Sequence, residues 1–77
     1  MTPEEQEQVR RIHSKAADLK AREKALSRLG ELMEESYILD FPADRALIKE
    51  LENFVASASA PASLKGKAKR LLKKYKI

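Results

Sequence analysis

The sequence predicts an all-α fold, a small bundle of three helices that becomes four if the first segment breaks near residues 17–24. Strong helix formers dominate the chain, and only two Gly and three Pro interrupt it. Apolar residues recur at spacings of three and four, which is the period of one helix face. The 77 residues suffice for one domain, and we expect them to form a single helical unit.

The first predicted helical segment covers residues 3–36. Thr2 stands where a capping residue belongs, Pro3 suits the first helical position, and Glu5 completes a capping box. Two apolar stripes follow, and their centres differ by about 120° around a helix. The first stripe is Val9, Ile12, Ala16 and Leu19, and the second is Ala25, Leu26, Leu29, Leu32 and Met33.

Two interpretations of these stripes remain open. One long helix could present its two halves to different neighbours, or the chain could break between the stripes. No Gly or Pro marks a break, and the polar residues 20–24 are strong helix formers, so we favour one continuous helix. Gly30 interrupts the second stripe, and a close helix crossing is one reason for a Gly at this position.

A connection and a second helix follow. Because Pro42 disfavours a helical conformation at Phe41, we expect the first segment to end here. Four apolar residues within five cannot face solvent without cost, so we expect the connection to pack against the core: Tyr37, Ile38, Leu39 and Phe41. The second helix, residues 42–57, begins near Pro42 with Asp40 or Phe41 as its cap. It carries the clearest core stripe of the chain: Leu47, Ile48, Leu51, Phe54 and Val55.

The segments 3–36 and 42–57 then form a helical hairpin over residues 3–57. A short Ser/Ala/Pro linker, residues 57–63, leads to a basic C-terminal helix over residues 63–76, with Ser63 as its cap. The apolar residues of this helix fall within an arc of about 100°: Leu64, Ala68, Leu71, Leu72 and Tyr75. All its cations lie outside that arc: Lys65, Lys67, Lys69, Arg70, Lys73, Lys74 and Lys76.

Catalysis has few candidate residues. His13 is the only histidine and the chain has no Cys, so we expect a boundary histidine and no enzyme. Glu31, Glu34 and Glu35 gather on the first segment, but no calcium-type loop surrounds them. We therefore expect a solvated acidic face, no metal site and no cofactor.

Charge is divided unevenly along the chain. Residues 1–61 carry nine Lys plus Arg against twelve Asp plus Glu, a net charge of −3, whereas residues 62–77 carry +7. The basic helix suits the phosphates of a nucleic acid, a groove on a partner protein, or an anionic membrane surface. Membrane binding is the weakest of these, because the chain lacks Trp and the apolar arc is narrow. Alternatively, the helix neutralises residues 31–52, whose net charge is −5.

We therefore expect a small non-enzymatic regulatory or adaptor protein that binds a macromolecule through the basic helix, with the nucleic-acid backbone as first candidate. The alternative is a protein–protein interaction module, either a self-associating bundle or an inhibitor-type binder. The small core makes a homo-oligomer an open alternative as well. Because residues 1–5 lack the apolar core of a secretory signal and no apolar run reaches the ~18 residues of a membrane span, we expect an intracellular, cytoplasmic protein.

Overall fold

The computed structural model of the chain describes residues 1–41 and 44–75. In this part it has no strand, and the predicted all-α fold is confirmed. Its helices are α1 (Pro3–His13), α2 (Leu19–Ile38), α3 (Arg45–Ala56) and α4 (Ala62–Tyr75). None of these helices is both long enough and apolar enough to cross a lipid bilayer.

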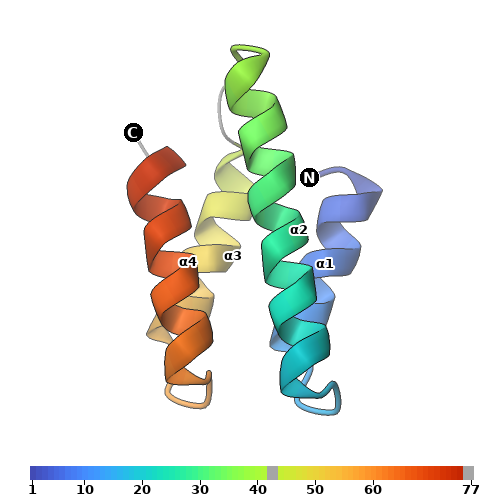
Figure 1. Ribbon diagram of the computed structural model, residues 1–77, viewed down its shortest axis with the longest axis vertical. Helices are drawn as coiled ribbons and strands as arrows, with labels where there is room; N and C mark the ends of the chain where they lie inside the picture. The colour runs from blue at the N-terminus through green and yellow to red at the C-terminus, as the bar shows by residue number, and fades with distance from the viewer. Residues whose placement is uncertain (42–43, 76–77) are drawn as a thin grey trace.

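The helices form two antiparallel hairpins, α1 with α2 and α3 with α4 (Figure 1). The hairpins pack side by side, so that α2 contacts α4 and α1 contacts α3. Around the bundle the helices therefore follow the order α1, α2, α4, α3. Because α3 begins at the same end of the bundle as α1, α2 and α4 run in the same direction (Figure 1).

The preference for one continuous helix over residues 3–36 was wrong, and the four-helix alternative is the one observed. The chain leaves the helical conformation at Ser14 and resumes it at Leu19. Asp18 is the cap that makes this possible, because its carboxylate accepts a hydrogen bond of 2.7 Å from the backbone N–H of Ala21. The break lets two stripes that would be out of line on one helix face the same core.

The turn between α1 and α2 also shortens the first apolar stripe. Val9 and Ile12 are buried, but Ala16 and Leu19 are exposed and contribute nothing to the core. Arg22 closes the turn, since its Nε donates a hydrogen bond of 3.0 Å to the carbonyl of Ile12. This bond satisfies one carbonyl that the end of α1 leaves without a helical partner.

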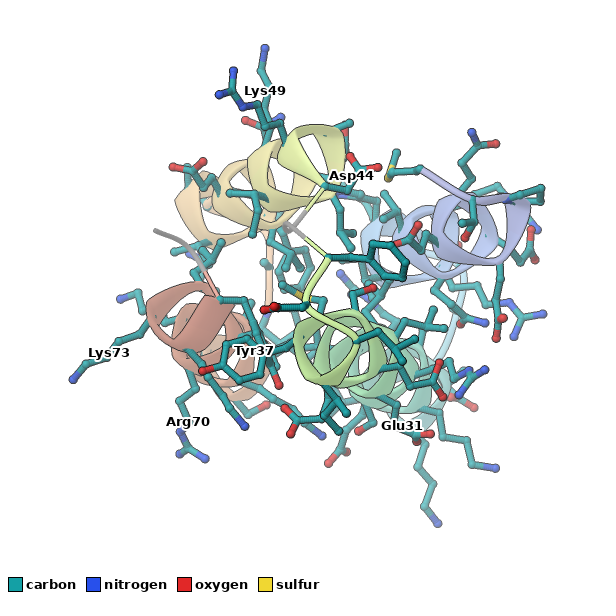
Figure 2. The ribbon with its side chains drawn as sticks, turned by 90° about the horizontal axis from the view of Figure 1, so that it is seen from above. Glu31, Tyr37, Asp44, Lys49, Arg70 and Lys73 are labelled. Atoms are coloured by element: carbon teal, nitrogen blue, oxygen red, sulfur yellow. The ribbon has the colours of Figure 1, made fainter. Side chains whose placement is uncertain are left out.

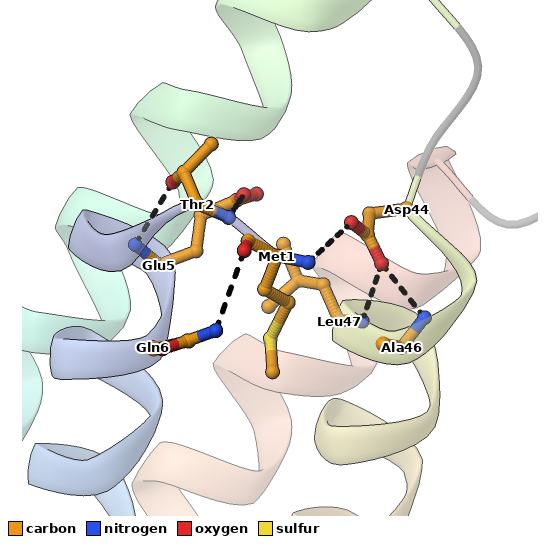
Figure 3. Close-up of polar contacts among 7 residues, drawn as sticks. All are labelled: Met1, Thr2, Glu5, Gln6, Asp44, Ala46 and Leu47. Atoms are coloured by element: carbon orange, nitrogen blue, oxygen red, sulfur yellow. Dashed lines mark hydrogen bonds and ion pairs between the residues drawn. The ribbon is translucent and has the colours of Figure 1, made fainter.

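The predicted capping box at the start of α1 is present. The Glu5 N–H donates to Thr2 Oγ1 at 3.2 Å, and the Thr2 N–H donates to Glu5 Oε1 at 2.8 Å (Figure 3). A second cap lies beside it, because Asp44 accepts hydrogen bonds from the first turn of α3 and also binds the Met1 amine at 2.9 Å. These contacts tie the start of α1 to the start of α3.

The predicted stripes on the later helices form most of the core. The buried residues of the described chain make one cluster: Val9, Ile12, Ala25, Leu26, Leu29, Met33, Leu47, Ile48, Leu51, Phe54, Ala60, Leu64, Ala68 and Tyr75. Val55, Leu71 and Leu72 pack against this cluster while partly exposed. The last helix begins at Ala62, so Ser63 lies inside it and is not its cap.

Candidate functional site

The apolar side of α4 belongs to the core. Leu64, Ala68 and Tyr75 are buried, and Leu71 and Leu72 pack against the same cluster. Burial of this face leaves α4 docked on α2 and α3. The exposed side of α4 therefore presents mainly its cations, since Leu64 is buried and Leu71 and Leu72 are partly covered.

Two of the predicted cations bind α2. The Lys67 ammonium donates a hydrogen bond to Ser27 Oγ, and Lys74 Nζ lies 3.0 Å from Glu34 Oε2. The Tyr75 hydroxyl also donates to Glu34, so one carboxylate holds two groups of α4. The Tyr75 hydrogen bond and the Lys74 ammonium hold the pKa of Glu34 below its usual range, and Glu34 in turn raises the pKa of Lys74.

Four of the predicted cations have no such partner. Within residues 1–41 and 44–75, no carboxylate pairs with Lys65, Lys69, Arg70 or Lys73. Lys69, Arg70 and Lys73 are exposed and Lys65 is half-buried, and Figure 2 shows Arg70 and Lys73 pointing away from the bundle. Lys65, Lys69 and Lys73 follow one another at four-residue steps, about 6 Å along the helix axis. Lys76 lies outside the described residues.

Several carboxylates of the acidic region, residues 31–52, pair with groups outside α4. These pairs include Glu31 with Arg28 at 3.1 Å, Asp44 with the Met1 amine at 2.9 Å, and Glu50 with His13 at 3.2 Å. Glu34 also belongs to this region, and it binds α4 through Lys74. Among the described residues, an acidic side chain therefore neutralises Lys74 but not the cations on the outer side of α4, which are Lys65, Lys69, Arg70 and Lys73.

His13 connects α1 to α3. Its Nε2 lies 3.2 Å from Glu50 Oε2, and its ring meets the Phe54 ring edge-on with centroids 5.7 Å apart. The residue therefore has a packing and pairing role at the boundary of the core. Among the described residues, no three His, Cys, Asp or Glu side chains gather closely enough to hold a metal ion.

A second surface lies where the connection after α2 was expected to pack against the core, and that expectation was wrong. Four large apolar side chains, which we call the apolar rim, are between 62% and 71% exposed: Tyr37, Ile38, Leu39 and Phe41. The cause is a difference in length. With 20 residues α2 is the longest helix, and its last turns extend beyond the ends of its neighbours (Figure 1). Since Lys74 and Tyr75 lie opposite Glu34, the described part of α4 offers no later turn to cover the rim.

The rim is held by a regular helix C-cap. Asp40 has φ of 63°, the Phe41 N–H donates to the Ser36 carbonyl at 2.9 Å, and the Asp40 N–H donates to the Tyr37 carbonyl at 3.1 Å. This pair of bonds is the Schellman motif, which usually places Gly at the left-handed position. Asp40 and Phe41 therefore close α2, and the prediction that one of them caps the next helix was wrong.

Comparison of the chain with models of protein families, with curated proteins and with solved structures gives no match. The functional argument therefore depends on the two surfaces of this molecule: the outer cations of α4 and the apolar rim.

Proposed function

We propose that the chain is a small non-enzymatic nucleic-acid-binding protein that contacts the phosphate backbone through the outer face of α4. One observation carries the proposal. Lys69, Arg70 and Lys73 are exposed together on one helix, and no carboxylate among the described residues neutralises them. Lys65 extends this row by one turn.

The chemistry of this face favours backbone contact over base recognition. Lysine meets a phosphate as a point charge, whereas bidentate recognition of bases depends on Arg, Asn or Gln. The outer face of α4 has one Arg, and Tyr75, the aromatic residue of this helix, is buried in the core. Neither base readout nor a stacking platform is therefore favoured, and affinity should depend steeply on salt.

Fluorescence anisotropy with a labelled 20-base-pair duplex tests the proposal. If four cations meet phosphates, affinity should fall on the order of 10²-fold between about 50 and 200 mM salt. The triple variant Lys69→Glu, Arg70→Glu, Lys73→Glu should abolish measurable binding and leave the helical circular-dichroism spectrum unchanged, because these side chains are exposed and lie outside the core.

A matched control separates this face from net charge. Lys15, Arg45 and Lys49 are also exposed and unpaired among the described residues, and Figure 2 shows Lys49 on the side of the bundle opposite Arg70. Changing these three to Glu alters the net charge by the same amount and should retain most of the binding. Equal loss in both triple variants, or full binding by the α4 variant, would reject α4 as the binding face.

A further inference from the structure

The apolar rim is a surface that binding through α4 leaves unused. The rim lies at the end of α2 that extends beyond the neighbouring helices (Figure 1), whereas Arg70 and Lys73 point outward from the side of α4 (Figure 2). Tyr37 and Phe41 are about one helical turn apart and both line a cavity, whereas Ile38 and Leu39 project from other faces of the same turn. Large exposed apolar side chains gathered at one end of a helix typically mark an interaction site. Leu19, the exposed Leu at the start of α2, stands alone by comparison.

A cavity of about 440 Å³ opens beneath the rim. Its apolar walls include Met33, Leu47 and Tyr75, and two rim residues, Tyr37 and Phe41, form its edge. This volume lies within the range of about 300–1,000 Å³ found for ligand-binding clefts. The cavity can therefore take one or two large apolar side chains of a partner.

Local contacts hold part of this site in place. The Schellman hydrogen bonds hold Asp40 and Phe41 in one backbone conformation, and the Tyr37 ring rests edge-on against Tyr75 with centroids 5.8 Å apart. Asp40 maintains its left-handed conformation without the freedom of Gly. A preformed surface loses little conformational entropy on binding.

The charges around the site favour a cationic partner. Asp40 lines the cavity and Glu35 lies one helical turn before Leu39, and neither carboxylate has a side-chain partner within residues 1–41 and 44–75. Lys74, the cation at the cavity, is already bound by Glu34. Two copies of the chain meeting rim to rim would bring like carboxylates together, which costs free energy, whereas a cationic partner would pair with them.

We propose that the apolar rim and its cavity bind an apolar helical segment of a partner protein whose anchor residues are flanked by Lys or Arg. The anchors fill the cavity and cover the rim, and the flanking cations meet Asp40 and Glu35. The chain would then hold a nucleic acid on α4 and a protein segment at the end of α2. This second site does not depend on the first.

A tryptophan-containing peptide tests the proposal directly, because the chain has no Trp of its own. The probe is a 14-residue amphipathic peptide with Leu and one Trp on its apolar face and Lys on both flanks. A matched peptide has Glu in place of Lys. The Lys peptide should bind saturably with a blue shift of its Trp emission, although the protein itself carries a net charge of +4. Equal binding of both peptides, or no binding of the Lys peptide, would overturn the proposal.

Rim variants locate the site. Ile38→Ser and Phe41→Ser should each lower the affinity for the Lys peptide about tenfold or more, as expected when a large side chain is removed from the centre of an interface. Leu19→Ser, which removes an exposed Leu at the other end of α2, is the matched control and should leave binding unchanged. Asp40→Asn and Glu35→Gln should lower the affinity for the Lys peptide several-fold. They should also reduce the ratio of the affinity for the Lys peptide to that for the Glu peptide. Unchanged affinity in the Ser variants would place the peptide elsewhere and reject the rim.

Two further measurements keep this proposal distinct from nucleic-acid binding and from self-association. The α4 triple variant should bind the Lys peptide at least as well as the unchanged chain, and loss of peptide binding there would assign the peptide to α4. Light scattering over a dilution series should give a constant monomer mass. A dimer that Phe41→Ser dissolves would make a second copy the occupant and overturn the proposal.

Discussion

Asp40 is the residue whose backbone conformation is least suited to its side chain. It is the non-Gly residue with positive φ among the described residues, and it stands where a Schellman motif usually has Gly. Asp tolerates the left-handed region better than most residues because its short side chain can bond locally, yet it still loses free energy relative to Gly. The conformation is therefore maintained at a modest cost to stability.

Replacing Asp40 with Gly should raise the free energy of unfolding by about 0.5–1 kcal/mol, because Gly reaches this φ without steric strain. Urea denaturation followed by circular dichroism measures the change. Asp40→Asn, which also suits the left-handed region, should leave stability nearly unaltered. A loss of stability in the Gly variant would show that the carboxylate makes a stabilising interaction that the backbone argument omits.

The two glycines show how the packing around a helix determines the effect of a substitution on stability. A Cβ on Gly66 would meet nothing within 4 Å, whereas a Cβ on Gly30 would lie 3.1 Å from Leu71 Cδ2. The sequence alone suggested a close helix crossing as one reason for Gly30, and the structure shows that α4 approaches α2 there.

Gly66→Ala should therefore stabilise α4 by about 1 kcal/mol, the difference in helix propensity between the two residues. Gly30→Ala gains the same propensity but forces Leu71 to move within a packed interface, so it should stabilise less or destabilise. Thermal unfolding of both variants beside the unchanged chain decides the matter. Equal gains in the two variants would mean that Leu71 adapts without cost.

Sequence reasoning succeeded where information is local. The capping box at Thr2 and the stripe on α3 are contained in a few consecutive residues, and both are present. It failed at the turn before α2, because the sequence around Asp18 does not distinguish a helix-capping Asp from an ordinary exposed one. It failed at Tyr37 and Phe41 because exposure depends on how far the neighbouring helices extend, which no single segment records.

For the cations of α4, too, the local feature could be predicted and the tertiary one could not. Periodicity placed all seven outside the apolar arc, but their availability depends on which carboxylates the other helices have already engaged. Lys67 and Lys74 bind α2, while Lys69, Arg70 and Lys73 stay unpaired among the described residues. Tertiary pairing of this kind cannot be deduced from the charge of a segment.

At the scale of the whole molecule, carboxylates join the helices to one another. Glu4 reaches Arg28 across α1 and α2 at 2.6 Å, Glu34 joins α2 to α4, and Asp44 holds the Met1 amine. The pKa of each carboxyl lies below its usual range, in every case first because of a hydrogen bond to its partner. Each therefore binds a proton less readily in the folded chain than in the unfolded one.

Stability should consequently be greatest above the ordinary carboxyl pKa of about 4 and should fall as the pH drops through the lower folded-state values. Urea midpoints at pH 7 and at pH 3 measure this loss. Glu34→Gln removes one of the carboxyls whose pKa is lowered in the folded chain and should reduce the dependence of stability on pH. If that variant keeps the full acid sensitivity, the Glu34 contact with Tyr75 and Lys74 does not contribute to it.

The arrangement of two hairpins has a kinetic consequence. Contacts within α1–α2 and within α3–α4 join residues close in sequence, so each hairpin can close over a short loop, with little chain entropy lost. Contacts such as Gly30 with Leu71 and His13 with Phe54 span about half the chain or more and form only when the hairpins dock. We therefore expect docking of the two hairpins to be the slow step of folding.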